Sequence, residues 1–210
     1  GVELFSGWGK FLDNKTISVK TSQGDNQNEV IIEAQNILIA VGGRPIIPKI
    51  TGSHLAWTSD DIFLLKDLPE HVVVVGAGYI ACEFACILQG LGVEVTQLVR
   101  GERLLRGFDF ELSSALTEAM QSKGINLIFG ENVSSIKGRP GFLTTSTITD
   151  KEFQSNGVLF ATGREPYLDG LKLEKSGVEV INNKIKVDSE NKTNISNIFA
   201  IGDVTNRINL

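Results

Sequence analysis

Long apolar runs and a surplus of positive charge are both missing from this sequence of 210 residues. Its apolar stretches, such as residues 37–41 and 72–75, fall far short of the roughly 20 residues that a membrane helix needs, so we predict no membrane partner. Lys and Arg number 20 against 25 Asp and Glu, which leaves a net charge of −5. Such a surface would not attract a polyanion, and we therefore predict no nucleic-acid partner.

Cysteine is scarce as well, with Cys82 and Cys86 as the two copies. Two cysteines do not make the disulfide framework of a small secreted domain, and no motif predicts a metal site. No signal-peptide pattern opens the sequence, so we expect a reducing, cytoplasmic location. Because the sequence begins without Met and stops soon after a motif, we expect it to be a segment of a longer polypeptide.

What the sequence does contain is ample apolar content, 41% of its residues, arranged in recognisable patterns. Residues 2–41 alternate apolar and polar side chains between turn-like stretches, which predicts a β-meander. The meander leads into NILIAVGGRP at 36–45, whose continuous apolar run is typical of a strand covered on both faces. The segment GVLFATGREP at 157–166 repeats this plan.

Residues 72–100, VVVVGAGYIACEFACILQGLGVEVTQLVR, read as strand, glycine turn, helix, glycine stop and strand, which predicts a βαβ unit. The helical spacing predicts that the helix buries Ile80, Phe84, Ile87 and Leu88. A second helix is expected to begin after Asp109, whose side chain can cap it. A third strand at 125–130 and a meander across 132–154 complete the pattern.

The turn Gly76-Ala77-Gly78 lies directly between a buried strand and an amphipathic helix. There the first glycine permits a tight turn, the second lets the backbone approach a pyrophosphate, and the helix N-terminus faces that anion. This context predicts a dinucleotide site. The alternative is a tight strand-to-helix turn that binds nothing.

Three arginines, Arg100, Arg103 and Arg106, follow the second strand, at the place where a carboxylate would bind the ribose 2′-hydroxyl of NAD. A planar guanidinium suits a bidentate contact with a 2′-phosphate. We therefore predict that Arg100 and Arg106 select NADP(H). The alternative, a solvated loop, is the interpretation that we prefer for Arg103, next to Glu102.

The quoted βαβ segment, together with VRGERLLRGFD, FATGREP and IFAIGDVTNRINL, resembles the flavin-containing pyridine nucleotide-disulfide oxidoreductases. Among them it is most similar to the middle of the glutathione reductases of cyanobacterial and plant type, and the resemblance runs through essentially all 210 residues. It implies an α/β fold, with a Rossmann-like NADPH-binding domain at 67–166. Segments of an FAD-binding domain would flank it, at 1–66 with a linker and at 167–210.

The resemblance also implies the roles of individual residues. Glu83 would lie near the nicotinamide carboxamide, Tyr79 would cover the flavin until NADPH displaces it, and Asp203 would bind hydroxyls of the FAD ribityl chain. The alternatives for Glu83 and Asp203 are a solvent-facing acid and a simple turn. The predicted NADPH-binding set is Gly76, Ala77, Gly78, Tyr79, Ile80, Glu83, Arg100, Arg106 and Gly163, and the predicted FAD-binding set is Gly9, Gly42 and Asp203.

Family members need two further parts that this sequence does not contain: a Cys-x4-Cys redox pair and a His-Pro with a supporting Glu. Cys82 and Cys86 stand four apart on a helix, and we interpret them as packed free thiols. We therefore predict no catalytic residue in the segment and expect it to be inactive alone.

The resemblance further implies a homodimeric parent oxidoreductase that passes hydride from NADPH through FAD to a disulfide and then to oxidised glutathione, in cell redox homeostasis. Two alternatives stay open. One is another NADPH-dependent flavoprotein disulfide reductase, and the other is a non-catalytic NADP(H)-sensing module.

Overall fold

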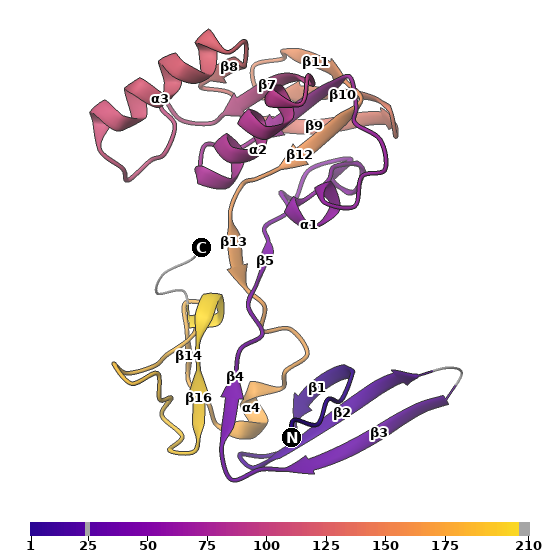
Figure 1. Cartoon of the computed structure of the whole chain (residues 1–210), viewed down its shortest axis with the longest axis vertical. Coiled ribbons are helices and arrows are strands. Elements are labelled where there is room, and N and C mark those ends of the chain that lie inside the picture. Colours follow the sequence, from indigo (N-terminus) through magenta and orange to yellow (C-terminus); the bar gives the residue numbers. More distant parts are fainter. Residues whose placement is uncertain (24–25, 206–210) are drawn as a thin grey trace. The chain divides into compact units, whose positions relative to one another are not determined.

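A computed structural model describes residues 1–23 and 26–205, and the chain divides into two compact units. The first unit consists of residues 1–44 and 165–210, and the second of residues 45–164. The short strands β5 (Gly43–Pro45) and β13 (Arg164–Pro166) mark the two points where the chain passes between the units. Figure 1 shows the course of the chain and the labels of its elements.

The first unit opens with the predicted meander. Its strands β1 (Gly7–Phe11), β2 (Thr16–Gln23) and β3 (Asn26–Glu33) pair antiparallel in the order β1-β2-β3. Beside it, β4 (Ile37–Ile39) pairs in parallel with β16 (Ile198–Ala200), although the two strands lie far apart in the sequence. The unit is completed by α4 (Leu173–Ser176), β14 (Val180–Ile181), β15 (Lys184–Ile185) and the 3-10 turn η2 (Gly202–Thr205).

The strand β4 differs from its predicted environment. Ile37 and Ile39 are buried in the core of the first unit, but Leu38 between them is 56% exposed. Side chains along a strand alternate between the two faces of the sheet, and in this unit only one face of β4 is covered. The prediction that both faces are covered is therefore wrong for this strand.

The second unit is built on a four-stranded parallel sheet in the order β12-β6-β7-β8. These strands and the two helices that connect them match the predicted βαβ pattern: β6 (His71–Val75), α2 (Tyr79–Gly90), β7 (Glu94–Val99), α3 (Phe110–Ser122), β8 (Asn126–Phe129) and β12 (Gly157–Phe160). An antiparallel meander of β9 (Val133–Arg139), β10 (Phe142–Thr147) and β11 (Glu152–Ser155) is inserted before β12. The short elements η1 (Ser53–Leu55) and α1 (Ser59–Ile62) precede the sheet.

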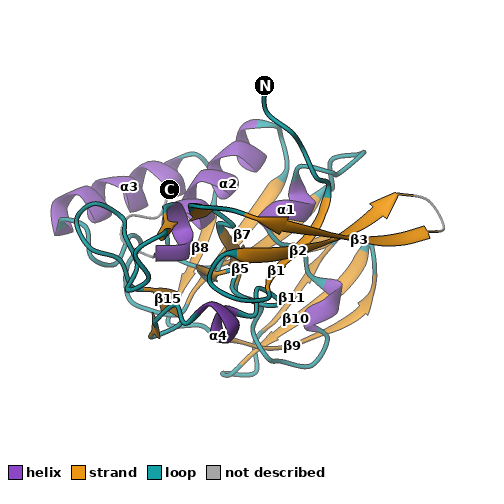
Figure 2. Cartoon of the chain, turned by 90° about the horizontal axis from the view of Figure 1, so that it is seen from below, coloured by secondary structure: helices purple, strands orange, loops and turns teal. Residues whose placement is uncertain are grey.

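The continuous valine run of β6 is explained by a core on each face of this sheet. Val72 and Val74 pack with α2 and α3, whereas Val73 and Val75 pack with the meander β9–β11. Figure 2 shows the two helices running along one side of the strands. The predicted α/β fold class, a parallel sheet with helices and a β-meander, is thus confirmed.

The helix α2 buries a different face from the predicted one. Its buried residues are Ala81, Cys82, Ala85 and Leu88, and only Leu88 was in the predicted set. Ile87 is 54% exposed, while Ile80 and Phe84 are partly buried. The glycine turn sets the rotation of the helix, and the small side chains let the helix pack close to the sheet. A helix with two apolar stripes cannot be oriented by periodicity alone.

Candidate functional site

The glycine turn lies at the carboxyl edge of the parallel sheet, where open α/β sheets bind ligands. Gly76 has φ of 144°, a backbone conformation that favours glycine. A Cβ on Gly76 would overlap the carbonyl oxygen of Ala161, whereas a Cβ on Gly78 would meet no atom within 4 Å. The two glycines therefore differ: packing requires the first, and the second leaves open space at the surface.

The N–H groups that lead into α2 have no hydrogen-bond partner among the residues that the structure describes. Gly78 is the N-cap residue, and no side chain caps the helix. Within residues 1–23 and 26–205, the N–H groups of Ala77, Gly78 and Tyr79 donate no hydrogen bond. Free N–H groups, the positive end of the helix dipole and an open approach form a cradle that fits a pyrophosphate.

The carbonyl groups of Gly76 and Ala77, in contrast, accept hydrogen bonds from the protein. The Gly76 oxygen accepts a hydrogen bond from the Gln97 side-chain amide at 2.9 Å, and the Ala77 oxygen accepts one from the Leu105 N–H at 2.7 Å. The Gly76 N–H donates to the Leu98 oxygen at 3.0 Å. The turn is thereby held against β7 and against the loop that follows β7.

That loop, residues 100–109, carries the three arginines and is anchored by two leucines. Leu104 is fully buried and Leu105 is 8% exposed, in the core shared with α2 and α3. Leu105 has φ of 49°, a strained value for a non-glycine residue that the packing maintains. The hydroxyl of Ser113 on α3 donates to the Leu104 oxygen at 2.7 Å, which fixes the loop from its other side.

Arg100 and Arg106 are exposed, and Arg103 is half-buried. None of the three forms an ion pair among the residues that the structure describes. Among the described residues no carboxylate pairs with these guanidinium groups, which leaves them available for a 2′-phosphate. Ion pairing therefore does not distinguish Arg103, predicted to be solvated, from Arg100 and Arg106, predicted to bind the 2′-phosphate.

An acidic residue close to this loop was missed at the sequence level. Glu131 is only 3% exposed, and its backbone N–H donates to the Val99 oxygen at 3.1 Å. Its carboxylate accepts bonds from the Thr149 hydroxyl at 2.7 and 2.8 Å and pairs with Lys151 at 2.8 Å. The Lys151 ammonium, then the Thr149 and Thr147 hydroxyls, lower the pKa of this carboxyl to about 2. A glutamate between two strands gives no sequence signal that its carboxylate will be buried and paired.

Gly163 lies at the same edge of the sheet as the glycine turn. It follows β12, which pairs with β6, and the Ala161 N–H donates to the Val75 oxygen at 2.9 Å. Gly163 has φ of 131° and is exposed. On α2, Tyr79 and Ile80 are half-buried, and Glu83 is exposed without an ion pair among the described residues.

The three residues predicted for FAD lie in the first unit. Gly42 has φ of 71°, and its oxygen accepts a hydrogen bond from the Tyr167 N–H at 3.0 Å. Asp203 in η2 lies against Gly43, where an added Cβ would be 3.3 Å from the carboxylate. In β1, a Cβ on Gly9 would make ordinary contact with Ile17 at 3.7 Å, whereas one on Gly7 would overlap the Lys20 oxygen. Packing thus requires glycine at Gly7, not at Gly9.

Both cysteines are free thiols, but only one is packed. Cys82 is buried in the core beneath α2, and this burial raises the pKa of its thiol. Cys86, one turn further along the helix, is exposed. The interpretation of both as packed thiols therefore holds for Cys82 and is wrong for Cys86.

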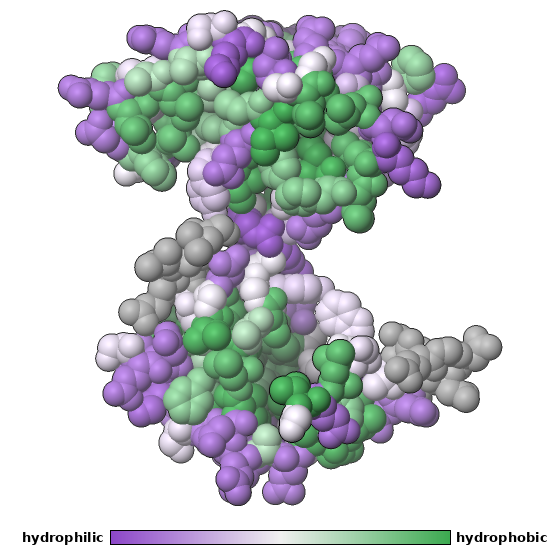
Figure 3. Space-filling model, viewed as in Figure 1, coloured by the Kyte–Doolittle hydropathy of each residue, from purple (hydrophilic) through white to green (hydrophobic). Residues whose placement is uncertain are grey.

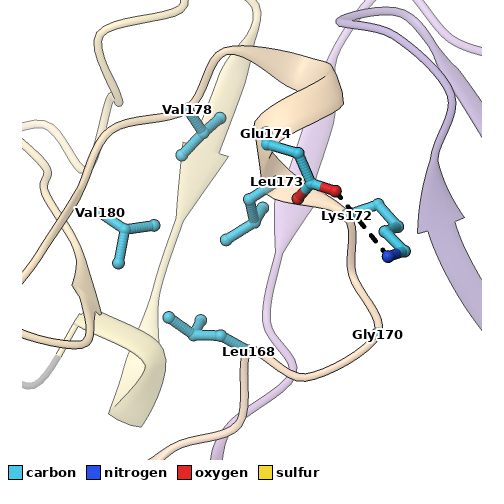
Figure 4. A pocket seen from close by; sticks show the side chains of 7 residues that line it. All are labelled: Leu168, Gly170, Lys172, Leu173, Glu174, Val178 and Val180. Atoms are coloured by element: carbon cyan, nitrogen blue, oxygen red, sulfur yellow. Dashed lines mark ion pairs between the residues drawn. The ribbon is translucent and has the colours of Figure 1, made fainter.

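The surface also carries features that the sequence did not predict. A cavity of about 420 Å³ in the first unit has an apolar floor, with Lys172 and Glu174 at 3.9 Å from each other beside it (Figure 4).

In the second unit, apolar side chains gather over α1 and α2 (Figure 3). The exposed apolar side chains of this unit include Phe63 and Leu64, both 79% exposed, and Leu91, 58% exposed. None of the helices in the described part of the chain combines the length and hydropathy that a membrane crossing demands.

Comparison with known proteins shows the family to which the chain belongs. The family model described as pyridine nucleotide-disulphide oxidoreductase matches residues 1–210. The chain is 41% identical to a glutathione reductase from Nostoc sp. and 40% identical to ones from Burkholderia cepacia and Pisum sativum, the last described as chloroplastic/mitochondrial. Each match covers all of this chain and, in the same order, 47%, 45% and 37% of the relative. The chain thus spans about half the length, or less, of the curated relatives it matches.

Solved structures show the same fold. The HOCl-induced flavoprotein disulfide reductase RclA from Escherichia coli, in its Cu(II) complex, superposes with a TM-score of 0.89 at 25% identity. The match covers 97% of this chain and 46% of that one. LpdA from Mycobacterium tuberculosis superposes with a TM-score of 0.85 at 24% identity, with the same coverage of both chains.

Proposed function

Because the chain belongs to the pyridine nucleotide-disulphide oxidoreductase family, we propose that it is the NADPH-binding part, and a portion of the FAD-binding part, of a glutathione reductase. We assign residues 67–166 to the NADPH-binding domain. Residues 1–66, with a linker, and 167–210 belong to the FAD-binding part. The parent would be a homodimeric cytoplasmic enzyme, and the segment alone would be inactive.

The observation that carries this proposal is the connection between the cradle and the arginine loop. The Leu105 N–H binds the Ala77 oxygen at 2.7 Å. The guanidinium groups and the N–H groups, which have no partner within residues 1–23 and 26–205, therefore belong to one anchored structure. A pyrophosphate and a 2′-phosphate are the two anionic groups of NADP(H). The turn offers backbone N–H donors for the pyrophosphate, and the loop offers guanidinium groups for the 2′-phosphate.

Each residue of the site has a distinct task in this proposal. The N–H groups of Ala77, Gly78 and Tyr79 bind the pyrophosphate, and Arg100 and Arg106 hold the 2′-phosphate through charge-assisted bonds. Exposed Glu83, one turn into α2, is available for the carboxamide of the nicotinamide.

The remaining residues complete the two cofactor sites. Ile80 and Gly163 flank the nicotinamide half of NADPH, and Tyr79 shields the flavin. Gly9, Gly42 and Asp203 belong to the FAD part. The bound cofactors supply hydride transfer from NADPH to FAD, with electrons passing on to a protein disulfide and then to oxidised glutathione; the chain orients them.

Glutathione as the substrate is supported by the 40–41% identity to glutathione reductases over the whole chain. A second candidate, a flavoprotein reductase of another disulfide, is favoured by the close superposition on RclA. Fold alone does not choose between them, since no residue of the described chain has been assigned to a disulfide substrate.

One experiment on the full-length parent tests the proposal. We expect a bound flavin in its absorbance spectrum and rapid oxidation of NADPH only when oxidised glutathione is added. Turnover with a different disulfide, but not with oxidised glutathione, would favour the second candidate. NADPH binding without flavin and without any disulfide reduction would indicate a nucleotide-sensing module instead.

A further inference from the structure

A buried polar side chain in the second unit contacts the glycine turn and has no assigned task. Gln97 lies on β7, opposite Val74 of β6, and is fully buried. Its amide Nε2 donates to the Gly76 oxygen at 2.9 Å and lies 3.9 Å from the Cys82 sulfur. Its Oε1 is buried and has no hydrogen-bond partner in the described part of the chain. An unsatisfied buried amide oxygen destabilises the fold by about 1–3 kcal/mol, so stability alone does not explain glutamine at this position.

We propose that Gln97 is a positioning residue for the dinucleotide cradle. A peptide group is planar and trans, so its C=O and its N–H point in opposite directions. The bond from Gln97 holds the Gly76 oxygen toward β7, and the N–H of the same peptide plane, which belongs to Ala77, therefore points away from Gln97. The direction of this N–H is thus set by a side chain that touches no ligand.

The next peptide plane is held in the same way. The Leu105 N–H binds the Ala77 oxygen, and so directs the Gly78 N–H away from the arginine loop. Gln97 and Leu105 together orient two successive free N–H groups. Because a glycine at Gly76 lets this peptide rotate more readily than any other residue would, the side-chain bond supplies an orientation that the backbone itself does not.

The inference rests on the proposed NADPH site. It predicts a different effect on the NADPH and NADH affinities from the effect predicted for the arginines. The pyrophosphate is common to NADPH and NADH, so a loss of Gln97 should weaken both equally. Loss of the arginines should weaken NADPH alone. A net hydrogen bond of about 0.5–1.5 kcal/mol corresponds to roughly a twofold to tenfold change in affinity.

The test is titration calorimetry of the chain with NADPH and NADH. Gln97→Met keeps the approximate shape and removes the donor, and we expect both affinities to fall by roughly twofold to tenfold. Gln97→Glu keeps the shape but faces the Gly76 oxygen with an acceptor, and we expect a larger fall. Melting temperatures of all variants are measured alongside.

Thr145→Val is the matched control. Thr145 is fully buried, and its hydroxyl also has no partner among the described residues, but it lies on β10 in the meander and not in the parallel sheet that carries the turn. We expect it to leave both affinities unchanged. Equal affinity losses in Thr145→Val and Gln97→Met would show a general effect of core substitution and overturn the proposal.

The outcomes separate this inference from the proposed function. If the wild-type chain binds NADPH and Gln97→Met binds both nucleotides as tightly as wild type, only the positioning role is wrong. If the wild-type chain binds neither nucleotide, the proposed function and the positioning role both fail.

Discussion

The backbone N–H of Leu105 donates a 2.7 Å hydrogen bond to the carbonyl oxygen of Ala77. This single bond joins the loop that carries the three arginines to the turn at which α2, the helix of the βαβ unit, begins. Leu104, the preceding residue, is fully buried. The position of the positive charge is therefore determined by the core of the second unit rather than by a free loop.

The arginine pair should decide between the two pyridine nucleotides. Arg100→Met combined with Arg106→Leu should weaken NADPH binding by about two to four orders of magnitude, because each guanidinium makes charge-assisted bonds to the 2′-phosphate. NADH binding should hardly change. Titration calorimetry measures both, with Arg103→Met, which removes one positive charge from the same loop, as the control. Equal losses for NADPH and NADH would refute the phosphate role.

The two glycines of the turn should respond differently to an added methyl group. Gly76→Ala should destabilise the fold by about 2 kcal/mol or more, because of its positive φ and the clash with the Ala161 oxygen. Gly78→Ala should cost less than about 1 kcal/mol, since its surroundings are open, yet it should weaken nucleotide binding. Urea unfolding and calorimetry together check this. A Gly78→Ala chain that binds normally would contradict a close approach of the pyrophosphate.

The buried anchor of the arginine loop should contribute more to the free energy of unfolding than the exposed part of the loop does. Leu104→Ala should cost about 2–5 kcal/mol of unfolding free energy, since it removes a fully buried side chain. Phe108→Ala, at a side chain that is 51% exposed in the same loop, should cost much less. Chemical unfolding measures both. Similar losses in the two variants would argue against anchoring by the core.

The free energy of unfolding should decrease at acid pH because the Glu131 carboxylate becomes protonated. The pKa of its carboxyl is lowered from 4.5 to about 2, so the folded state binds this proton less readily than the unfolded chain does. The stabilisation is complete above pH 4.5 and is lost as the pH falls toward 2. Urea midpoints at pH 7, 4 and 3 should therefore show a decrease in wild type that is smaller in Glu131→Gln. A parallel decrease in both proteins would exclude Glu131 as a source.

Local signals were sufficient to predict most elements of the second unit. The glycine turn, the helix after Asp109 and the strand at 126–129 each depend on residues within a few positions of one another. Asp109, for example, accepts hydrogen bonds from the N–H groups of Glu111 at 2.9 Å and Leu112 at 3.2 Å, as its position before the helix predicts. The candidate site could be placed for the same reason, since the turn and the arginine loop follow adjacent strands of one parallel sheet.

Interactions between distant segments were out of reach of the sequence pattern. Glu131 contacts Thr149 and Lys151, and Gln97 contacts Gly76, only because the pairing of strands brings together residues that are 18 or more positions apart in the chain. The spacing of residues in the sequence does not predict the partner of a buried acid or of a buried amide.

The sequence by itself determined the βαβ unit, the tight turn and the positive charge next to it, because backbone geometry, capping and side-chain period are local properties. Only the tertiary structure decided which stripe of α2 is buried, that Leu38 faces outward, and which side chains hold the turn. Those outcomes depend on the packing of one surface against another, and a helix or strand with apolar residues on two faces meets its neighbour in a way that its own period does not specify.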